Sequence, residues 1–78
     1  MGRTLTVTRA AIPATDEARY LEACRREAAR VRATGDHYWL FRHEDQPGVF
    51  LEFRESGNRE RLRAADPSAE LWHAVELP

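Results

Sequence analysis

The stretch from His37 to Arg54 constrains the fold more than any other part of the sequence. Two segments rich in aromatic and β-branched residues, 37–43 and 49–54, flank a turn that contains Pro47-Gly48. Segments of this kind on either side of a Pro-Gly turn are typical of a β-hairpin. We therefore predict two antiparallel strands joined by a loop of residues 44–48.

The loop length determines the pairing of the two strands, and a shift of one residue would turn every side chain to the other side of the sheet. The predicted pairs are His43 with Val49, Phe41 with Leu51 and Trp39 with Phe53. Because side chains alternate between the two sides of a strand, this register sorts the hairpin into two sets. The apolar set consists of Trp39, Phe41, Val49, Leu51 and Phe53, with His37 and His43 at its ends. The mixed set consists of Tyr38, Leu40, Arg42, Phe50, Glu52 and Arg54.

The two sets differ in what they are expected to contact. The apolar set has the composition of a core and is expected to face the helices of the same chain. The mixed set is too apolar for free exposure to water and too charged for the core of a monomer. We therefore expect it to be buried between two copies of the chain.

The residues before the hairpin predict one strand and one long helix. Thr4–Arg9 alternates threonine with Leu5 and Val7, which is typical of a half-buried strand. A helix is expected from an N-cap at Thr15 to about Ala33. Its apolar stripe consists of Ala18, Leu21, Cys24, Ala28 and Val31, which are spaced three or four residues apart.

The residues after the hairpin predict two further helices. Asn58 is a possible cap for a short helix, Arg59–Ala65, and Asp66-Pro67 is typical of the start of another, Ser68–Leu77. With this C-terminal helical region counted once, the element order is β-α-β-β-α, which predicts an α+β, ferredoxin-like arrangement with helices on one side of the sheet. A right-handed first crossover places the third strand between the other two, so the expected three-stranded antiparallel sheet has the order 1-3-2.

Composition limits the classes of protein to which the chain can belong. It has 78 residues, a formal net charge of −1 and one cysteine, Cys24. This length predicts a single domain over residues 1–78 with a thin core, for which association is a common remedy. The balanced charge argues against nucleic-acid binding, and a lone cysteine cannot form an internal disulfide, which fits a cytoplasmic location. No apolar run is long enough for a membrane span.

The sequence resembles the dimeric α+β barrel superfamily, which includes the antibiotic-biosynthesis-monooxygenase-like (ABM-like) domains. The resemblance covers nearly the whole chain. It rests on the threonine-rich first strand, the long helix ending at Thr34-Gly35-Asp36, the aromatic second strand, the Asp45-Gln46-Pro47 turn, the Val-Phe-Leu-Glu-Phe-Arg strand at 49–54 and the Asp-Pro-Ser-Ala-Glu-Leu-Trp segment at 66–72. In such proteins two sheets face each other across a two-fold axis, which implies a homodimer.

The chain differs from that superfamily at its end. Members usually carry a fourth strand after the second helix, whereas Ala74–Pro78 is expected here to be the end of a helix. The fourth strand is therefore expected to be either missing or very short. Some relatives oxidise aromatic substrates without a cofactor, and others degrade haem with a tryptophan, a helix histidine and an asparagine on the first strand. His73 and Trp39 partly match the haem-degrading set, but the first strand has threonines in place of the asparagine.

The candidate metal ligands do not form a recognisable site. They are His37, His43, His73, Glu44, Glu52 and Cys24. His37 and His43 share a face, but the strand between them separates them by about 20 Å, which is too far for one ion. No pair has the i, i+4 spacing of a helical zinc motif. We therefore expect no metal and no bound cofactor.

A small-molecule pocket between the helices and the sheet is a further possibility. Its expected walls are Tyr20, Cys24, Trp39, Phe41, Phe53, Leu71 and Trp72. Aromatic walls with a few convergent polar groups are typical of ligand sites. The candidate catalytic residues are Tyr20, His43 and His73, since a histidine can act as a base near neutral pH. The alternative is that these large side chains simply fill the core, and Cys24 is then a buried structural thiol.

The mixed set offers two interpretations. Its charged members, Arg42, Glu52 and Arg54, can form an ion-pair cluster at a dimer interface together with Tyr38 and Phe50. The two arginines can alternatively bind an anion. Taken together, we expect a small homodimer that binds or oxidises a small aromatic molecule without a cofactor, and the alternative is a non-enzymatic dimerisation or accessory module.

Overall fold

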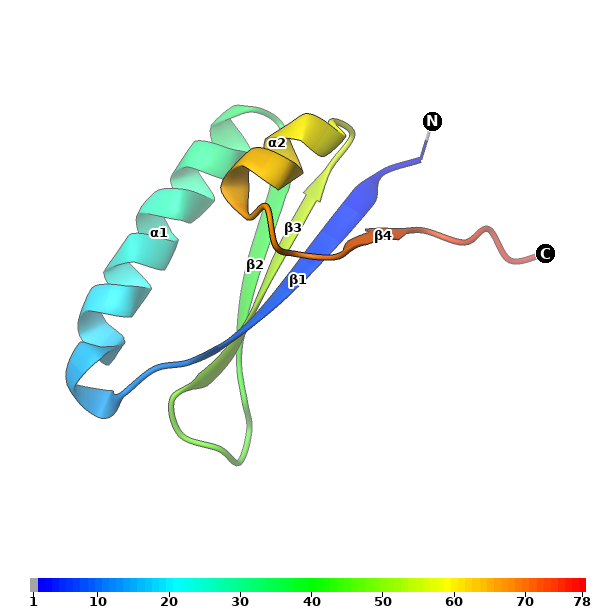
Figure 1. Cartoon of the computed structure of the whole chain (residues 1–78). Coiled ribbons are helices and arrows are strands. Elements are labelled where there is room, and N and C mark those ends of the chain that lie inside the picture. The colour runs from blue at the N-terminus through cyan, green and yellow to red at the C-terminus, as the bar shows by residue number, and fades with distance from the viewer. Residues whose placement is uncertain (1) are drawn as a thin grey trace.

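The computed structural model describes residues 2–78 and shows an α+β fold. Two helices cover one side of a four-stranded antiparallel sheet with the order β2-β3-β1-β4 (Figure 1). The elements are β1 (Thr4–Ala11), a 3-10 turn (Ala14–Asp16), α1 (Glu17–Ala33), β2 (His37–Arg42), β3 (Val49–Ser56), α2 (Arg59–Ala65) and β4 (Leu71–His73). No helix within residues 2–78 is long and apolar enough to cross a membrane.

The hairpin has the predicted register. Phe41 pairs with Leu51 and Trp39 with Phe53, and the His43 amide donates to the Val49 carbonyl at 2.8 Å. Gly48 closes the loop with a positive φ of 76°. A Cβ atom at this position would lie 2.3 Å from the Ile12 carbonyl oxygen, so only glycine allows the loop to approach the end of β1 this closely.

Helix α1 ends as predicted and begins slightly differently. It finishes at Ala33, and Gly35 follows with a φ of 84°, the left-handed conformation that commonly ends helices. At the other end Thr15 lies inside the 3-10 turn, and Asp16 takes the N-cap position without a side-chain hydrogen bond. The prediction of Thr15 as the N-cap was therefore wrong by one residue.

The two sides of the hairpin are reversed relative to the prediction. Helix α1 packs on the mixed set, where Tyr38 is 3% and Phe50 1% exposed, while Trp39 is 42% and Phe41 55% exposed on the opposite side. The core cluster joins Tyr38 to Cys24, Ala28 and Val31 of α1. Burial of the charged residues beside this cluster is possible because α1 supplies their partners: Arg54 Nε donates to Glu27 at 3.0 Å.

The C-terminal part follows the prediction only as far as α2. The Asn58 side chain caps this helix by accepting from the Glu60 and Arg61 amides. Asp66 accepts from the Ser68 amide and hydroxyl, as the N-cap of a helix would. The residues after it form only a turn, and the predicted helix Ser68–Leu77 does not form. Instead β4 pairs antiparallel with Thr4–Thr6 of β1. The order of the first three strands agrees with 1-3-2, and the fourth strand, which was expected to be either missing or very short, is present with three residues.

One buried carboxylate joins three elements at the end of the sheet. Asp36 follows α1, accepts from Arg61 Nε of α2 at 2.7 Å and from the Ser56 hydroxyl of β3 at 2.9 Å, and also accepts from Thr34. The hydrogen bonds from Arg61 are the largest cause that lowers the pKa of Asp36, to about 2. The carboxylate therefore stays ionised and holds α2 against α1 and β3 at neutral pH.

Candidate functional site

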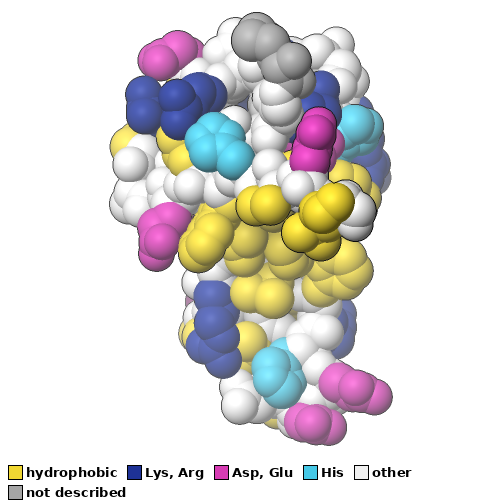
Figure 2. All heavy atoms as spheres, turned by 90° about the vertical axis from the view of Figure 1, so that its right-hand side faces the viewer, with side chains coloured by type: hydrophobic (Ala, Val, Ile, Leu, Met, Phe, Trp, Pro, Cys, Tyr) yellow, Lys and Arg dark blue, Asp and Glu magenta, His cyan; other side chains and the backbone are white. Residues whose placement is uncertain are grey.

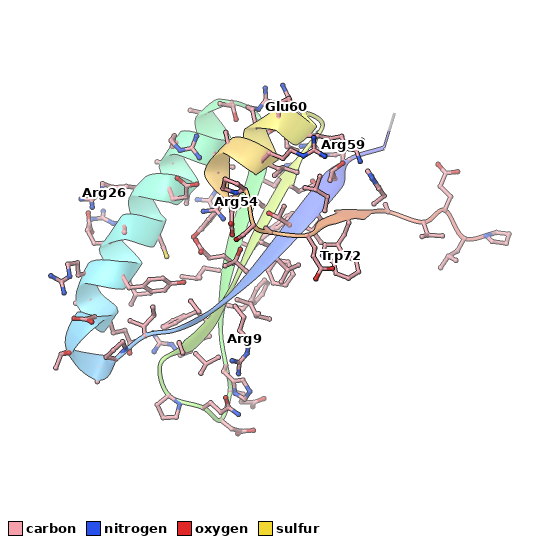
Figure 3. The ribbon with its side chains drawn as sticks, in the orientation of Figure 1. Arg9, Arg26, Arg54, Arg59, Glu60 and Trp72 are labelled. Atoms are coloured by element: carbon pink, nitrogen blue, oxygen red, sulfur yellow. The ribbon has the colours of Figure 1, made fainter. Side chains whose placement is uncertain are left out.

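A cleft opens on the helix side of the sheet, between α1, β3 and α2. Its volume is about 310 Å³, and it is lined by Tyr20, Ala23, Cys24, Glu27, Glu52, Arg54 and Ala65. The four residues from α1 stand at positions i, i+3, i+4 and i+7, counted from Tyr20, and so share one face of the helix. Glu52 and Arg54 are two apart on β3 and point to the same side. Figure 3 shows Arg54 on this side of the sheet and Trp72 on the other.

Glu52 is the centre of the polar groups in the cleft. Its Oε2 accepts from the Tyr38 hydroxyl, from Cys24 Sγ at 3.9 Å and from Arg54 Nη2 at 3.5 Å. Within residues 2–78 no hydrogen bond reaches the other oxygen, Oε1, and it is not among the enclosed polar atoms that lack a partner. The side chain keeps 14% of its surface exposed. Glu52 therefore offers one free acceptor atom to a molecule in the cleft.

Arg54 is held by groups on three sides. Its Nε donates to Glu27, its Nη2 donates to Glu52, and its guanidinium lies over the Tyr38 ring, 5.4 Å from the centroid. Arg42 pairs with Phe50 along the hairpin and Arg54 with Tyr38, so about 13 Å of strand separates the two arginines. They do not form the shared anion site that was one interpretation of the mixed set.

Tyr20 forms one wall of the cleft. Its ring packs against Phe50 with 5.0 Å between the centroids, and its hydroxyl is enclosed without a hydrogen bond. Burial raises the pKa of Tyr20, and the neighbouring Cys24 thiol and Glu52 carboxylate raise it further. Burial, Cys24 and Glu52 raise the pKa of Tyr38 as well. Both phenols therefore remain protonated donors near neutral pH.

The predicted pocket does not exist as one set of residues. Tyr20 and Cys24 line the cleft, whereas the other predicted wall residues do not. Trp39, Phe41, Phe53 and Trp72 lie on the opposite side of the sheet, as their register shows. The sequence therefore predicted two genuine cleft residues and combined them with four from the other side and with Leu71, which pairs with Thr6 and does not line the cleft.

The two histidines proposed as catalytic lie outside the cleft. His43 Nδ1 accepts from the Asp45 and Gln46 amides, so it organises the hairpin loop. His73 lies on β4, where Nδ1 is 3.4 Å from the Thr4 hydroxyl and Nε2 is 3.1 Å from Arg59 Nη2. Of the three candidate catalytic residues, only Tyr20 faces the cleft.

The mixed set cannot form the dimer interface that was predicted for it. Tyr38, Phe50 and Arg54 are buried beneath α1, Glu52 bonds to groups under the same helix, and Arg42 pairs with Glu17 of α1. The helix of the same chain already covers these residues. The sequence predicted Glu52 and Arg54 as a charged pair. It did not reveal Glu27 of α1, which accepts a hydrogen bond from Arg54 and lines the cleft together with both residues.

The other side of the sheet carries a continuous apolar surface, which we call the open face. It consists of Leu5, Val7, Trp39, Phe41, Val49, Leu51, Phe53 and Trp72. Figure 2 shows hydrophobic side chains gathered across the middle of this face, with charged side chains and histidines around them. Trp72 is 52% exposed, and Phe41 meets Phe53 edge to face at 5.4 Å. No element of residues 2–78 covers this surface.

Neither a metal centre nor a relative identifies the site. No group of three or more His, Cys, Asp or Glu side chains within the described residues is arranged to hold a metal ion. The chain matches no protein-family model, no curated protein and no solved structure. The resemblance to the dimeric α+β barrels therefore stays a prediction.

Proposed function

We propose that the protein works as a ferredoxin-like homodimer, with the open faces of two copies packed against each other. The β-α-β-β-α-β element order and the strand order β2-β3-β1-β4 are those of a ferredoxin-like domain. The single observation that carries the proposal is the open face itself. Large contiguous apolar surfaces of this kind mark interaction sites, because a folded chain gains little by leaving them in water.

A second copy is the occupant that this surface fits best. A two-fold contact brings the same patch of both copies together, so an apolar centre meets an apolar centre. The rim is polar and already paired within each chain: Glu55 accepts from His37 and Arg3, and Arg9 donates to Gln46. A desolvated apolar centre inside a polar rim is the usual anatomy of a stable interface.

The oligomeric state tests this proposal directly. Native mass spectrometry at low micromolar concentration should show a dimer for the wild type and a monomer for Phe41→Glu, which places a charge in the centre of the open face. Ala29→Glu adds the same charge on an exposed position of α1 and should leave the dimer intact. A wild-type monomer, or a Phe41→Glu variant that still dimerises, would contradict the proposal.

The cleft supports a second proposal, that each protomer binds a small aromatic molecule. Tyr20 supplies an aromatic wall, and Glu52 supplies a free acceptor at the floor. Cofactor-free oxidation, the monooxygenase-like activity that the resemblance implies, begins with removal of a proton from the substrate. Glu52 takes the place of the distant histidines in that role. The competing function is an accessory dimerisation module whose cleft holds only water.

Ligand binding can be tested separately from dimerisation. Ala23→Trp should fill the cleft, because Ala23 lines it from α1. Chemical-shift changes on adding aromatic probes should then gather at Tyr20 and Cys24 in the wild type and disappear in this variant. If no probe shifts these residues at millimolar concentration, the accessory-module function is favoured and the dimer proposal is unaffected.

A further inference from the structure

We propose that the cleft between α1, β3 and α2 selects a small amine, bound as its ammonium ion through Oε1 of Glu52. This inference rests on the proposal that the cleft is a ligand site and specifies the charge of the ligand. It follows from three features of the cleft: its excess of negative charge, the engagement of its only arginine and the character of its wall.

The charged residues that line the cleft carry a net negative charge. Glu27 and Glu52 provide two carboxylates, and Arg54 provides one guanidinium. Beyond the lining, Arg30 pairs with Glu27 from an exposed position. Hydrogen bonds from Ser68 and Thr8 lower the pKa of the Asp66 carboxyl group, and the nearby Arg54 guanidinium lowers it further. These two outer charges oppose each other, so one negative charge remains in excess at the cleft.

Arg54 cannot serve an anionic ligand without losing its present contacts. Its guanidinium contacts Glu27, Glu52 and the ring of Tyr38, and only 11% of its side chain is exposed. A ligand carboxylate would have to displace Glu27 or Glu52 from it while lying beside the carboxylate that it displaced. Like charges at such short range are strongly unfavourable where water is largely excluded.

An ammonium ion satisfies the groups that remain. It has hydrogen-bond donors and no acceptor, which matches the free acceptor Oε1 of Glu52. Tyr20 stands in the same cleft, and the face of a tyrosine ring attracts a cation. Ala23 and Ala65 have short side chains and leave the cleft at about 310 Å³, the lower end of the roughly 300–1,000 Å³ that small-molecule sites occupy.

Three probes of similar size and different charge test the selection. They are 2-phenylethylamine, 2-phenylethanol and 3-phenylpropionate, each titrated into the full chain at neutral pH and followed by the chemical shifts of Tyr20 and Cys24. The amine should bind at least tenfold more tightly than the alcohol, and the carboxylate should bind more weakly than both. Equal or tighter binding of the alcohol or the carboxylate would overturn the inference.

Two variants separate a specific contact from general attraction. Glu52→Gln keeps the size of the side chain and should remove the tenfold advantage of the amine. Asp45→Asn removes the same charge from the exposed hairpin loop and should preserve the advantage. If Glu52→Gln does not fold, Glu27→Gln tests the same charge balance and should reduce the advantage. If none of the probes binds, the ligand site and this inference both fail. The dimer proposal is unaffected, because it depends only on the native mass spectrometry.

Discussion

The two faces of this sheet show that the polarity of side chains does not by itself decide which face a helix covers. The covered face buries Thr6, Arg54 and Ser56, whereas the open face leaves Trp39 and Phe41 exposed. The difference lies in the partners that each face finds within the chain. Helix α1 and the turn after it supply Glu27 and Asp36 to the polar groups of the covered face, and no element within residues 2–78 supplies apolar surface to the open face.

This comparison explains why polar residues can be buried on the covered face. Buried polar groups are tolerated when each has a hydrogen-bond partner. Among the enclosed side-chain nitrogen and oxygen atoms of residues 2–78, only Arg3 Nη2 and the Tyr20 hydroxyl lack one. Tyr20 lines the cleft, so one of these two exceptions lies where a ligand is proposed to bind.

The largest predicted effect tests the difference in burial between the two faces, by truncating one phenylalanine on each face. Phe50 is 1% exposed and Phe41 55% exposed. Phe50→Ala should lower the free energy of unfolding by about 3–5 kcal/mol, because it leaves a cavity under α1. Phe41→Ala should change the unfolding free energy of the monomer by only about 0.5 kcal/mol, as is usual for exposed positions.

Urea unfolding measures both effects, provided that the chain is monomeric during the measurement. A Trp39→Glu background should secure this by placing a charge on the open face. Equal losses for the two alanine variants would show that both faces are covered in the monomer. A larger loss for Phe41→Ala would reverse the assignment of the faces.

Alternation along the hairpin was enough to predict the register but not the side on which the helices lie. The pairing of Trp39 with Phe53 follows from the loop length alone. Which set faces α1 depends on contacts between residues far apart in the sequence, such as Glu27 with Arg54. An apolar set also suits a surface that another chain covers, so composition favoured the wrong side.

The end of the chain was mispredicted for a different reason. Leu71 and Val75 are four apart, which suits a helix, but Leu71, His73 and Val75 also alternate as in a strand. Asp66-Pro67 favoured the helix. The outer edge of β1 at Thr4–Thr6 decides the outcome, because pairing with β4 satisfies its backbone groups. That edge is known only once the sheet is assembled.

The candidate site was predicted in pieces. Tyr20 and Cys24 were placed in a pocket and do line the cleft, since the stripe of α1 was correct. Glu52 was recognised as a charged centre but assigned to an interface between copies. The histidines were chosen for the usual pKa of this residue type. Nothing in the sequence shows that His43 organises a turn or that His73 lies on an edge strand beside Thr4 and Arg59.

A second prediction, with a smaller expected effect on stability, concerns the pH dependence of Asp36, the carboxylate that joins α1, α2 and β3. The pKa of Asp36 is lowered from its ordinary 3.8 to about 2, chiefly by Arg61. A lowered pKa in the folded state contributes stability that is present above the unfolded pKa and is lost as pH falls toward the folded pKa. We expect about 2 kcal/mol from this group at neutral pH, lost between roughly pH 4 and pH 2.

The difference in unfolding free energy between the wild type and Asp36→Asn isolates the contribution of Asp36 from that of other titrating groups. The wild type should be more stable by about 2 kcal/mol at pH 7, and the gap should narrow as the pH is lowered through that range. Asp45→Asn, in the exposed loop, should show no comparable gap. A gap that stays constant from pH 7 to pH 2 would mean that ionisation of Asp36 contributes nothing.

The smallest predicted effect compares two tyrosines on the same covered side. The Tyr38 hydroxyl donates to Glu52, whereas the Tyr20 hydroxyl has no partner. Tyr38→Phe should cost about 1–2 kcal/mol of unfolding free energy, because the partly buried carboxylate of Glu52 loses a donor. Tyr20→Phe should be neutral or stabilise by up to about 1 kcal/mol, because it removes an unpaired polar group.

Urea unfolding of the two variants at neutral pH measures both effects on the unfolding free energy. If Tyr20→Phe were as destabilising as Tyr38→Phe, the Tyr20 hydroxyl would have a partner in solution, and the neighbouring Cys24 thiol, which helps to raise the pKa of Tyr20, would be the first candidate.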